Sequence, residues 1–290
     1  MRVLLGLAVV LTGCAPVQEP QRPSDQGQEP LPAALCVGDG DGVLSADEVP
    51  AVDLALQIKS SFLVAPSGTV LPAGWNDDGF DLGLDRLPTQ AGSDLVFSGP
   101  EALEGAWFAD RFPDGEWQAV LDFSTGTRGV FARQEDAVLL LGIASSEPDD
   151  VAVRYTPPVP LFVLPMADGD SWEVAADATG IADGTTWPED LGANGVVSLV
   201  HRWSFSVDGG GLASLPGADL PVLRLRLVLR TEAYNSIAGL FAADAQRVTF
   251  LVAECLGTVA RMRSGPDELA EDFDVTTELL RFGLAPELIP

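Results

Sequence analysis

Carboxylates alternate with glycines between residues 37 and 48, a spacing that can hold a hard cation. Asp39 and Asp41 are separated by a single glycine, and Glu48 follows after a short polar and apolar stretch. Calcium prefers carboxylate oxygens, and glycines allow the tight backbone turns that bring several such oxygens together. The run therefore predicts either a calcium site or a solvated turn, since Gly and Asp are also ordinary turn residues.

The same run, Val37–Glu48, resembles the EF-hand calcium loop when Gly42 is set at the sixth position, where that loop turns sharply. The resemblance implies a set of calcium ligands at positions three, five, seven, nine and twelve: Asp39, Asp41, the carbonyl of Val43, Ser45 and Glu48. Val37 departs from the family pattern, because position one is normally aspartate. We expect a weak site whose calcium is structural and stiffens the start of the folded domain.

Catalytic motifs are absent from the sequence. His201 is the single histidine, so a zinc site of three histidines is excluded and any Ser-His-Asp triad would have to use it. His201 falls on the apolar face of an expected strand, where a histidine is more often a core residue than a base. We expect no enzyme and assign no catalytic residue, although 43 acidic residues leave a carboxylate pair open.

The N-terminus has the composition of an export signal. Arg2 precedes an apolar run, Val3–Leu11, that is much shorter than the roughly 20 residues needed to cross a bilayer. Leu11–Cys14 (LTGC) resembles the bacterial lipobox. The resemblance implies that residues 1–13 are a signal peptide, removed in the mature protein, and that Cys14 carries the lipid. The alternative is an ordinary signal peptide that ends near a cysteine.

The resemblance also implies a cellular location. Ala15 is not the aspartate that retains such lipoproteins at the inner membrane, so we expect an outer-membrane protein that faces the periplasm or the surface. Residues 14–34 are rich in Pro, Gln and Glu, so we expect them to form a lipidated, disordered tether. The membrane, reached through the lipid, is thus the one partner expected; the sequence identifies no protein or small-molecule partner.

A formal net charge of −27 excludes nucleic acid as a partner, because phosphates repel such a surface. The charge is explained by solubility, with a specific cationic ligand as the alternative. With Cys14 assigned to lipid, Cys36 and Cys255 remain as an even pair in an oxidising compartment. We expect a disulfide between them; the alternative is two free thiols.

Beyond residue 50, short apolar runs with a period of two alternate with Gly, Pro and Asp, which predicts a mainly β fold with little helix. We expect an antiparallel sandwich or an open curved barrel. In Val222–Arg230, odd positions are apolar and even ones are largely arginine, so one face should meet a core and the other water. The only helix candidates are Ser45–Leu56 and Asp267–Leu280.

Consecutive prolines at Pro157–Pro160 suggest a boundary, because they cannot pair in a central strand. The expected organisation after the tether is an EF-hand-like loop (35–50), a β lobe (51–156), a second β lobe or sheet (157–265) and an acidic C-terminal segment (266–290) that includes the second helix candidate.

Four runs in the second half resemble uncharacterised secreted bacterial lipoproteins: Gly169–Trp172, Gly211–Pro216, Val222–Arg226 and Glu254–Arg261. The resemblance implies a curved antiparallel sheet and no established activity. The leading hypothesis is a membrane-anchored, non-enzymatic domain for binding or structure. One alternative is a carrier that holds an apolar ligand in the curved sheet. Another is a carbohydrate-active or carbohydrate-binding domain that uses some of the six tryptophans.

Overall fold

The computed structural model describes most of the chain after residue 37. The described residues are 38–49, 61–75, 77, 79–93, 97–122, 126–147, 150–182, 185–187, 196–235, 239–271 and 273–283. The chain divides into a unit Met1–Leu35 and a compact unit Cys36–Pro290, and every described residue belongs to the second unit. The predicted signal peptide, the tether, Cys14 and Cys36 lie outside the described residues.

Strands make up most of the described chain, which confirms the mainly β fold with little helix. The strands are β1 (Val43–Leu44), β2 (Ser61–Ala65), β3 (Thr69–Val70), β4 (Asp81–Gly83), β5 (Ala91–Ser93), β6 (Phe97–Ser98), β7 (Trp117–Asp122), β8 (Thr127–Arg133), β9 (Ala137–Ala144), β10 (Val151–Val163), β11 (Met166–Ala167), β12 (Ser171–Ala182), β13 (Thr185–Trp187), β14 (Val196–Leu215), β15 (Ala218–Asn235), β16 (Gly239–Ala253), β17 (Gly257–Pro266), β18 (Val275–Thr276) and β19 (Glu278–Gly283). The described helical segments are α2 (Pro100–Glu104) and the 3-10 turns η1 (Leu84–Arg86) and η2 (Ala109–Arg111).

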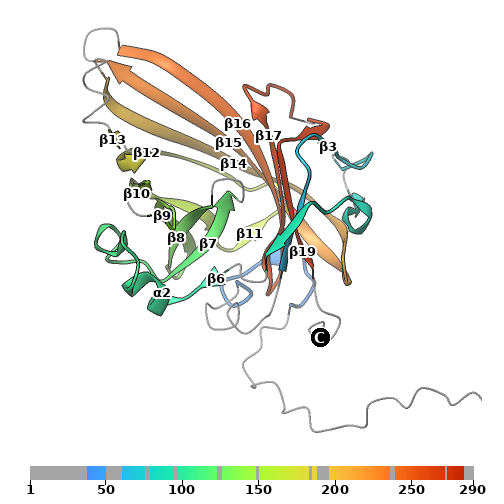
Figure 1. Cartoon of the computed structure of the whole chain (residues 1–290). Coiled ribbons are helices and arrows are strands. Elements are labelled where there is room, and N and C mark those ends of the chain that lie inside the picture. Colours follow the sequence, from blue (N-terminus) through green and yellow to red (C-terminus); the bar gives the residue numbers. More distant parts are fainter. Residues whose placement is uncertain are drawn as a thin grey trace, which may run out of the picture. The chain divides into compact units, whose positions relative to one another are not determined.

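One large sheet of 15 strands organises the domain. Its order is β5-β2-β19-β17-β16-β15-β14-β12-β10-β9-β8-β7-β6, with β13 paired to β12 and β4 to β14. Neighbours pair antiparallel except β4 and β14, which are parallel. Within the described residues the end strands β5 and β6 do not pair, so the sheet is open and is not a closed barrel. Figure 1 shows the long strands β14–β16 beside one another, with the shorter strands β7–β9 curled toward them.

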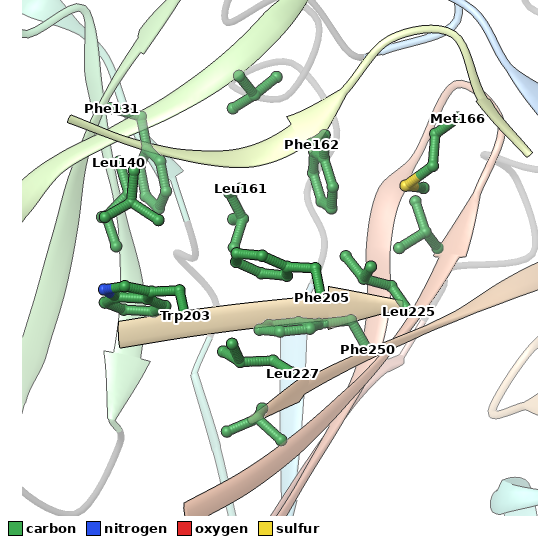
Figure 2. Close-up of a cluster of buried hydrophobic side chains, with 14 of the residues drawn as sticks. Phe131, Leu140, Leu161, Phe162, Met166, Trp203, Phe205, Leu225, Leu227 and Phe250 are labelled. Carbon is green, nitrogen blue, oxygen red and sulfur yellow. The ribbon is translucent and has the colours of Figure 1, made fainter. Parts of the chain in front are cut away.

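This curvature encloses the main hydrophobic core. Alternate residues of β14, Trp203 and Phe205, point to one face of the sheet and meet Phe131 of β8 and Leu140 of β9 in a single buried cluster. Figure 2 shows these side chains between the two curled parts of the sheet, with Leu225 among them. Burial of such large apolar side chains is the main favourable term that holds the curved sheet together.

The opposite face of the sheet is covered as well. Leu251 of β16 points away from the main core, while its neighbours Phe250 and Val252 point into it, as the period of two requires. Leu251 packs in a second cluster with Trp75 and Leu82, which precede β5. A third, smaller cluster joins the α2–η2 segment to the outer face of β8 and β9.

The arginine face of Val222–Arg230 differs from the expectation. Leu223, Leu225 and Leu227 are buried in the core as predicted, but Arg224 is 1% exposed instead of facing water. Its guanidinium donates to Asp208 Oδ1 at 2.7 Å and to the carbonyl of Trp75 at 2.7 Å. For Arg224 the prediction was wrong, because a covering segment far away in the sequence supplies acceptors that a buried arginine needs, whereas Arg230 is exposed as expected.

The proline run and the C-terminal segment also differ from the predictions. β10 continues through Pro157–Pro160, and a register shift between Arg154 and Val159 leaves Pro157 and Pro158 without a partner in β9 or β12. Proline has no backbone N–H group. Because Pro157 and Pro158 are not paired with a neighbouring strand, no hydrogen bond between strands is lost at these two positions. Strands from both predicted lobes lie in the same sheet. The helix expected in Asp267–Leu280 is wrong, because β18 and β19 occupy its second half and β19 pairs on both sides.

Candidate cation site

The acidic loop predicted from the sequence is folded by its own aspartates. Asp39 Oδ1 accepts the N–H of Asp41 at 3.0 Å, and Asp41 Oδ1 accepts the N–H of Val43 at 2.7 Å. Gly40 and Gly42 have φ angles of 73° and 77°, a left-handed conformation that glycine adopts without steric cost. Aspartates that bond to the backbone two residues on, alternated with left-handed glycines, thus set the local turn.

Glu48 closes this loop from inside. Its side chain is 6% exposed. One carboxylate oxygen, Oε2, accepts the N–H of Ser45 at 2.9 Å and the hydroxyl of Ser45 at 2.7 Å. Its backbone carbonyl accepts the N–H of Cys255 at 2.6 Å. Glu48 therefore ties the loop to the turn that joins β16 to β17.

That turn supplies a third carboxylate. Glu254 Oε2 accepts the N–H of Gly40 at 2.9 Å. One oxygen each from Asp39, Glu48 and Glu254 lies within 4.8 Å of the other two. Gly38 packs so closely against Glu254 that an added Cβ would lie 2.5 Å from Glu254 Oε2. The glycine is thus required for the close approach, and a larger residue there would displace the carboxylate.

The loop is also anchored to the sheet by its apolar residues. β1 pairs with β11, with Val43 opposite Ala167 and Leu44 opposite Met166. Leu44 is 1% exposed and belongs to the main core. Arg133 of β8 donates to the carbonyl of Ala46. These contacts hold the carboxylates in place without a metal, which is the preorganisation that a binding site requires.

The structure brings together only part of the predicted ligand set. Asp39 and Glu48 are in the cluster, whereas the Asp41 carboxylate is outside it and caps Val43. The Ser45 hydroxyl oxygen lies 2.7 Å from both Asp47 Oδ1 and Glu48 Oε2. Its hydrogen bond to Asp47 lowers the pKa of that carboxyl group. Sequence reasoning missed Glu254, which is 214 positions from its partner Gly40. Only the pairing of β16 with the rest of the sheet could have revealed it.

The donor set has the chemistry that calcium prefers. All three groups offer hard carboxylate oxygens, two from the acidic loop and one from the turn between β16 and β17. Among the described residues, the ion pairs found do not involve Asp39, Glu48 or Glu254. Three negative charges so close together repel one another, and a divalent cation would relieve that repulsion. The calcium assignment itself stays a prediction.

His201 is a core residue in this structure. Its ring is 7% exposed and lies beside Tyr155 and Trp203, with 3.2 Å between His201 Nδ1 and the Tyr155 hydroxyl. Burial lowers the pKa of His201 to about 4, so the ring is neutral at pH 7. Its Nε2 is buried with no hydrogen-bond partner among the described residues. The position on the apolar face agrees with the sequence analysis.

Cys255 and the tryptophans complete the set of predicted residues. Cys255 is disulfide-bonded, and the described residues contain no other cysteine. The pairing with Cys36 stays a prediction, because Cys36 lies outside the described residues. None of the five tryptophans whose side chains are described is exposed, namely Trp75, Trp107, Trp117, Trp172 and Trp203. Trp172, for example, stacks on Phe205 with centroids 4.9 Å apart.

In the described part of the chain, no helix has the length and apolar character needed to cross a bilayer. A comparison of the chain with family models, with curated proteins and with solved structures finds no match in any of the three.

Proposed function

We propose that this protein is a lipid-anchored component of the bacterial cell envelope whose β domain serves a binding or structural role without catalysis. Cys14 is the proposed lipid attachment site, and a calcium ion held by Asp39, Glu48 and Glu254 is the proposed stabiliser of the domain's N-terminal edge. The observation that carries the calcium proposal is the convergence of three carboxylates from two distant segments.

The position of this cluster suggests what the ion would do. The loop that contains Asp39 and Glu48 is the first described segment, and it follows the expected tether directly. Glu254 belongs to the turn between β16 and β17, two strands that have neighbours on both sides in the sheet. A calcium ion would therefore cross-link the start of the domain to interior strands of the sheet, and a pull on the tether would be transmitted to the sheet.

Calorimetric titration of calcium into the full chain tests the proposed ion. We expect a dissociation constant of roughly 10⁻⁴ to 10⁻³ M, as in extracellular calcium modules. At ten times that concentration, the gain in unfolding free energy is about 1.4 kcal/mol, which thermal melts would detect. Glu254→Gln and Asp39→Asn should abolish the heat and the stabilisation. Glu104→Gln, which removes the same charge from an exposed position on α2, should change neither.

Two results would contradict the calcium proposal. The first is the absence of both heat and stabilisation at about 10 mM calcium, well above the expected dissociation constant. The second is unchanged binding in Glu254→Gln, which would place the ion elsewhere. In either case the cluster would be a set of backbone-capping carboxylates, a role that the hydrogen bonds of Asp39 and Glu48 already show.

Incorporation of labelled palmitate tests the anchor separately. Cells that express the wild-type chain should yield labelled protein in the membrane fraction, whereas Cys14→Ser should yield unlabelled protein. Identical labelling of both chains, or no labelling of either, would remove the anchor from the proposal and leave the β domain and its cation site unaffected.

The alternative functions receive less support from the described residues. A carrier of apolar ligands requires a chamber of several hundred Å³, but on the inner face of the sheet side chains such as Phe131, Trp203 and Phe205 pack together in one buried cluster. A carbohydrate platform requires adjacent exposed tryptophans, and the five tryptophans whose side chains are described are buried or half-buried. Neither alternative is therefore our proposal.

A further inference from the structure

A small recess lies beside the carboxylate cluster and shares Glu254 with it. Its volume is about 120 Å³. The acidic loop contributes Gly40 and Gly42, and the ends of β14 and β15 contribute Gly210 and Pro221. Gly40, Gly42 and Pro221 are exposed, so the recess can be reached from solvent. Glu254, a member of the carboxylate cluster, also lines the recess, and its Oε2 accepts the N–H of Gly40, another lining residue.

Missing side chains explain why the recess exists. Gly210 and Gly211 of β14 line the recess without side chains, next to a shift of register in the pairing of β14 with β15 between Val207 and Gly210. A Cβ built on Gly210 would have Val222 O at 3.5 Å and Leu223 Cδ2 at 3.9 Å as its nearest neighbours. These are ordinary contacts with two residues that also line the recess, so a side chain at position 210 would be accommodated and would fill the space.

The chemistry of the lining selects for one kind of ligand. Leu44, Val222, Leu223 and Val252 form an apolar wall. The only charged side chain in the lining is the half-buried carboxylate of Glu254. A matching ligand has an apolar body and one positively charged hydrogen-bond donor, because charge-assisted hydrogen bonds to a carboxylate are the strongest that a side chain of this type can make.

The size of the recess limits the body of the ligand. An apolar cavity of about 150 Å³ in another protein holds benzene, which has six carbon atoms. By that standard a recess of 120 Å³ takes about five non-hydrogen atoms. We propose that this recess binds a primary alkylammonium group of about four carbons, with the ammonium donating to Glu254 and the chain against Leu44 and Val252.

Two sources could present this group. It could be a free alkylamine, or it could be the side chain of a lysine on another polypeptide, which has the same four methylenes and ammonium. The proposal does not require calcium. Because Glu254 belongs to both sites, a bound divalent ion would compete for its charge, and the affinity for each ligand would fall when the other is bound.

The test is a titration of n-butylammonium chloride into the full chain in the presence of a chelator. Binding is monitored through the NMR chemical shifts of the backbone amides of Gly40, Gly42 and Gly210. We expect saturable shifts with a dissociation constant of roughly 1–10 mM, as a ligand of five heavy atoms permits. n-Butanol, which has the same shape without the charge, should bind at least about tenfold more weakly. Equal affinity for n-butanol, or no shift up to about 50 mM n-butylammonium, would overturn the proposal.

Variants locate the ligand. Glu254→Gln and Gly210→Val should each weaken n-butylammonium binding by about tenfold or more, the first by removing the charge and the second by filling the recess. Gly265→Val is the matched control, because a Cβ at Gly265 meets no atom within 4 Å. Unchanged binding in Glu254→Gln would overturn the proposal. If Gly210→Val fails to fold, the comparison of n-butylammonium with n-butanol on the wild-type chain still tests whether the recess selects a charged ligand.

Two further titrations separate the outcomes. Asp39→Asn should lose calcium binding and keep n-butylammonium binding, so failure of the calcium site and failure of the recess are distinguishable. Nα-acetyl-lysine methylamide supports a lysine side chain as the source if it binds as tightly as n-butylammonium. Binding of n-butylammonium alone supports a free amine.

Discussion

The buried histidine predicts a specific loss of stability in acid. His201 has a folded-state pKa of about 4 because burial disfavours the charged ring, whereas its value in the unfolded chain is about 6.5. Between these two pH values the unfolded chain binds more protons, so unfolding becomes easier as the pH falls. Each pH unit of pKa difference corresponds to about 1.4 kcal/mol, and we expect about 2 to 3 kcal/mol to be lost between pH 7 and pH 4.5.

Urea unfolding of the wild type and of His201→Phe at the two pH values measures this loss. The many carboxylates also respond to acid, but they respond alike in both chains, so the difference between the chains isolates the histidine. Phenylalanine preserves an aromatic ring beside Tyr155 and Trp203 without a titratable group. The negative charge of Asp244 raises the pKa of His201, but it only partly offsets the lowering caused by burial. Equal acid losses in wild type and His201→Phe would refute the reasoning.

Two further predictions concern the sheet. Asp208→Asn should lower the free energy of unfolding by about 3 kcal/mol in urea, because Arg224, 1% exposed, would lose its carboxylate partner; a loss under about 1 kcal/mol would show that the carbonyl acceptors suffice. Gly142→Ala should cost about 2 kcal/mol or more, because its Cβ would lie 2.1 Å from the carbonyl of Val153 and force β9 from β10. Gly265→Ala, with open space around its Cβ, should leave the melting temperature unchanged.

Local periodicity predicted the fold class because each strand shows its buried face in its own residues. The alternation of Leu223, Leu225 and Leu227 with polar neighbours places these leucines in the core without knowledge of any other strand. Periodicity could not tell what covers the other face. Arg224 is buried by a segment about 150 positions earlier, and a basic residue at that spacing normally predicts a solvated face.

Short elements were the least predictable part. α2 begins with Pro100 after Gly99, a signal for the first turn of a helix, but five residues give too little periodicity to detect. The helix expected in Asp267–Leu280 included the first half of β19, where Leu279 and Leu280 are adjacent apolar residues. In the sheet both leucines are buried, since β19 lies between β17 and β2 with both faces covered. A strand buried on both sides loses the alternation that identifies it.

Two residues of the candidate site, Asp39 and Glu48, could be predicted from the sequence, whereas the third, Glu254, could not. Asp39 and Glu48 stand in a local motif whose turn is set by neighbouring glycines, so their proximity follows from the chain itself. Glu254 reaches them because β16 ends where the loop docks, and that depends on the register of β15 with β16 across the whole sheet. A long strand fixes this register firmly, because a slip by one residue would turn Phe250 out of the core. The same hydrophobic pattern that stabilises the sheet thus positions the third carboxylate. A substitution that shifts β16 should therefore weaken the cation site and the adjoining recess together, although it touches neither.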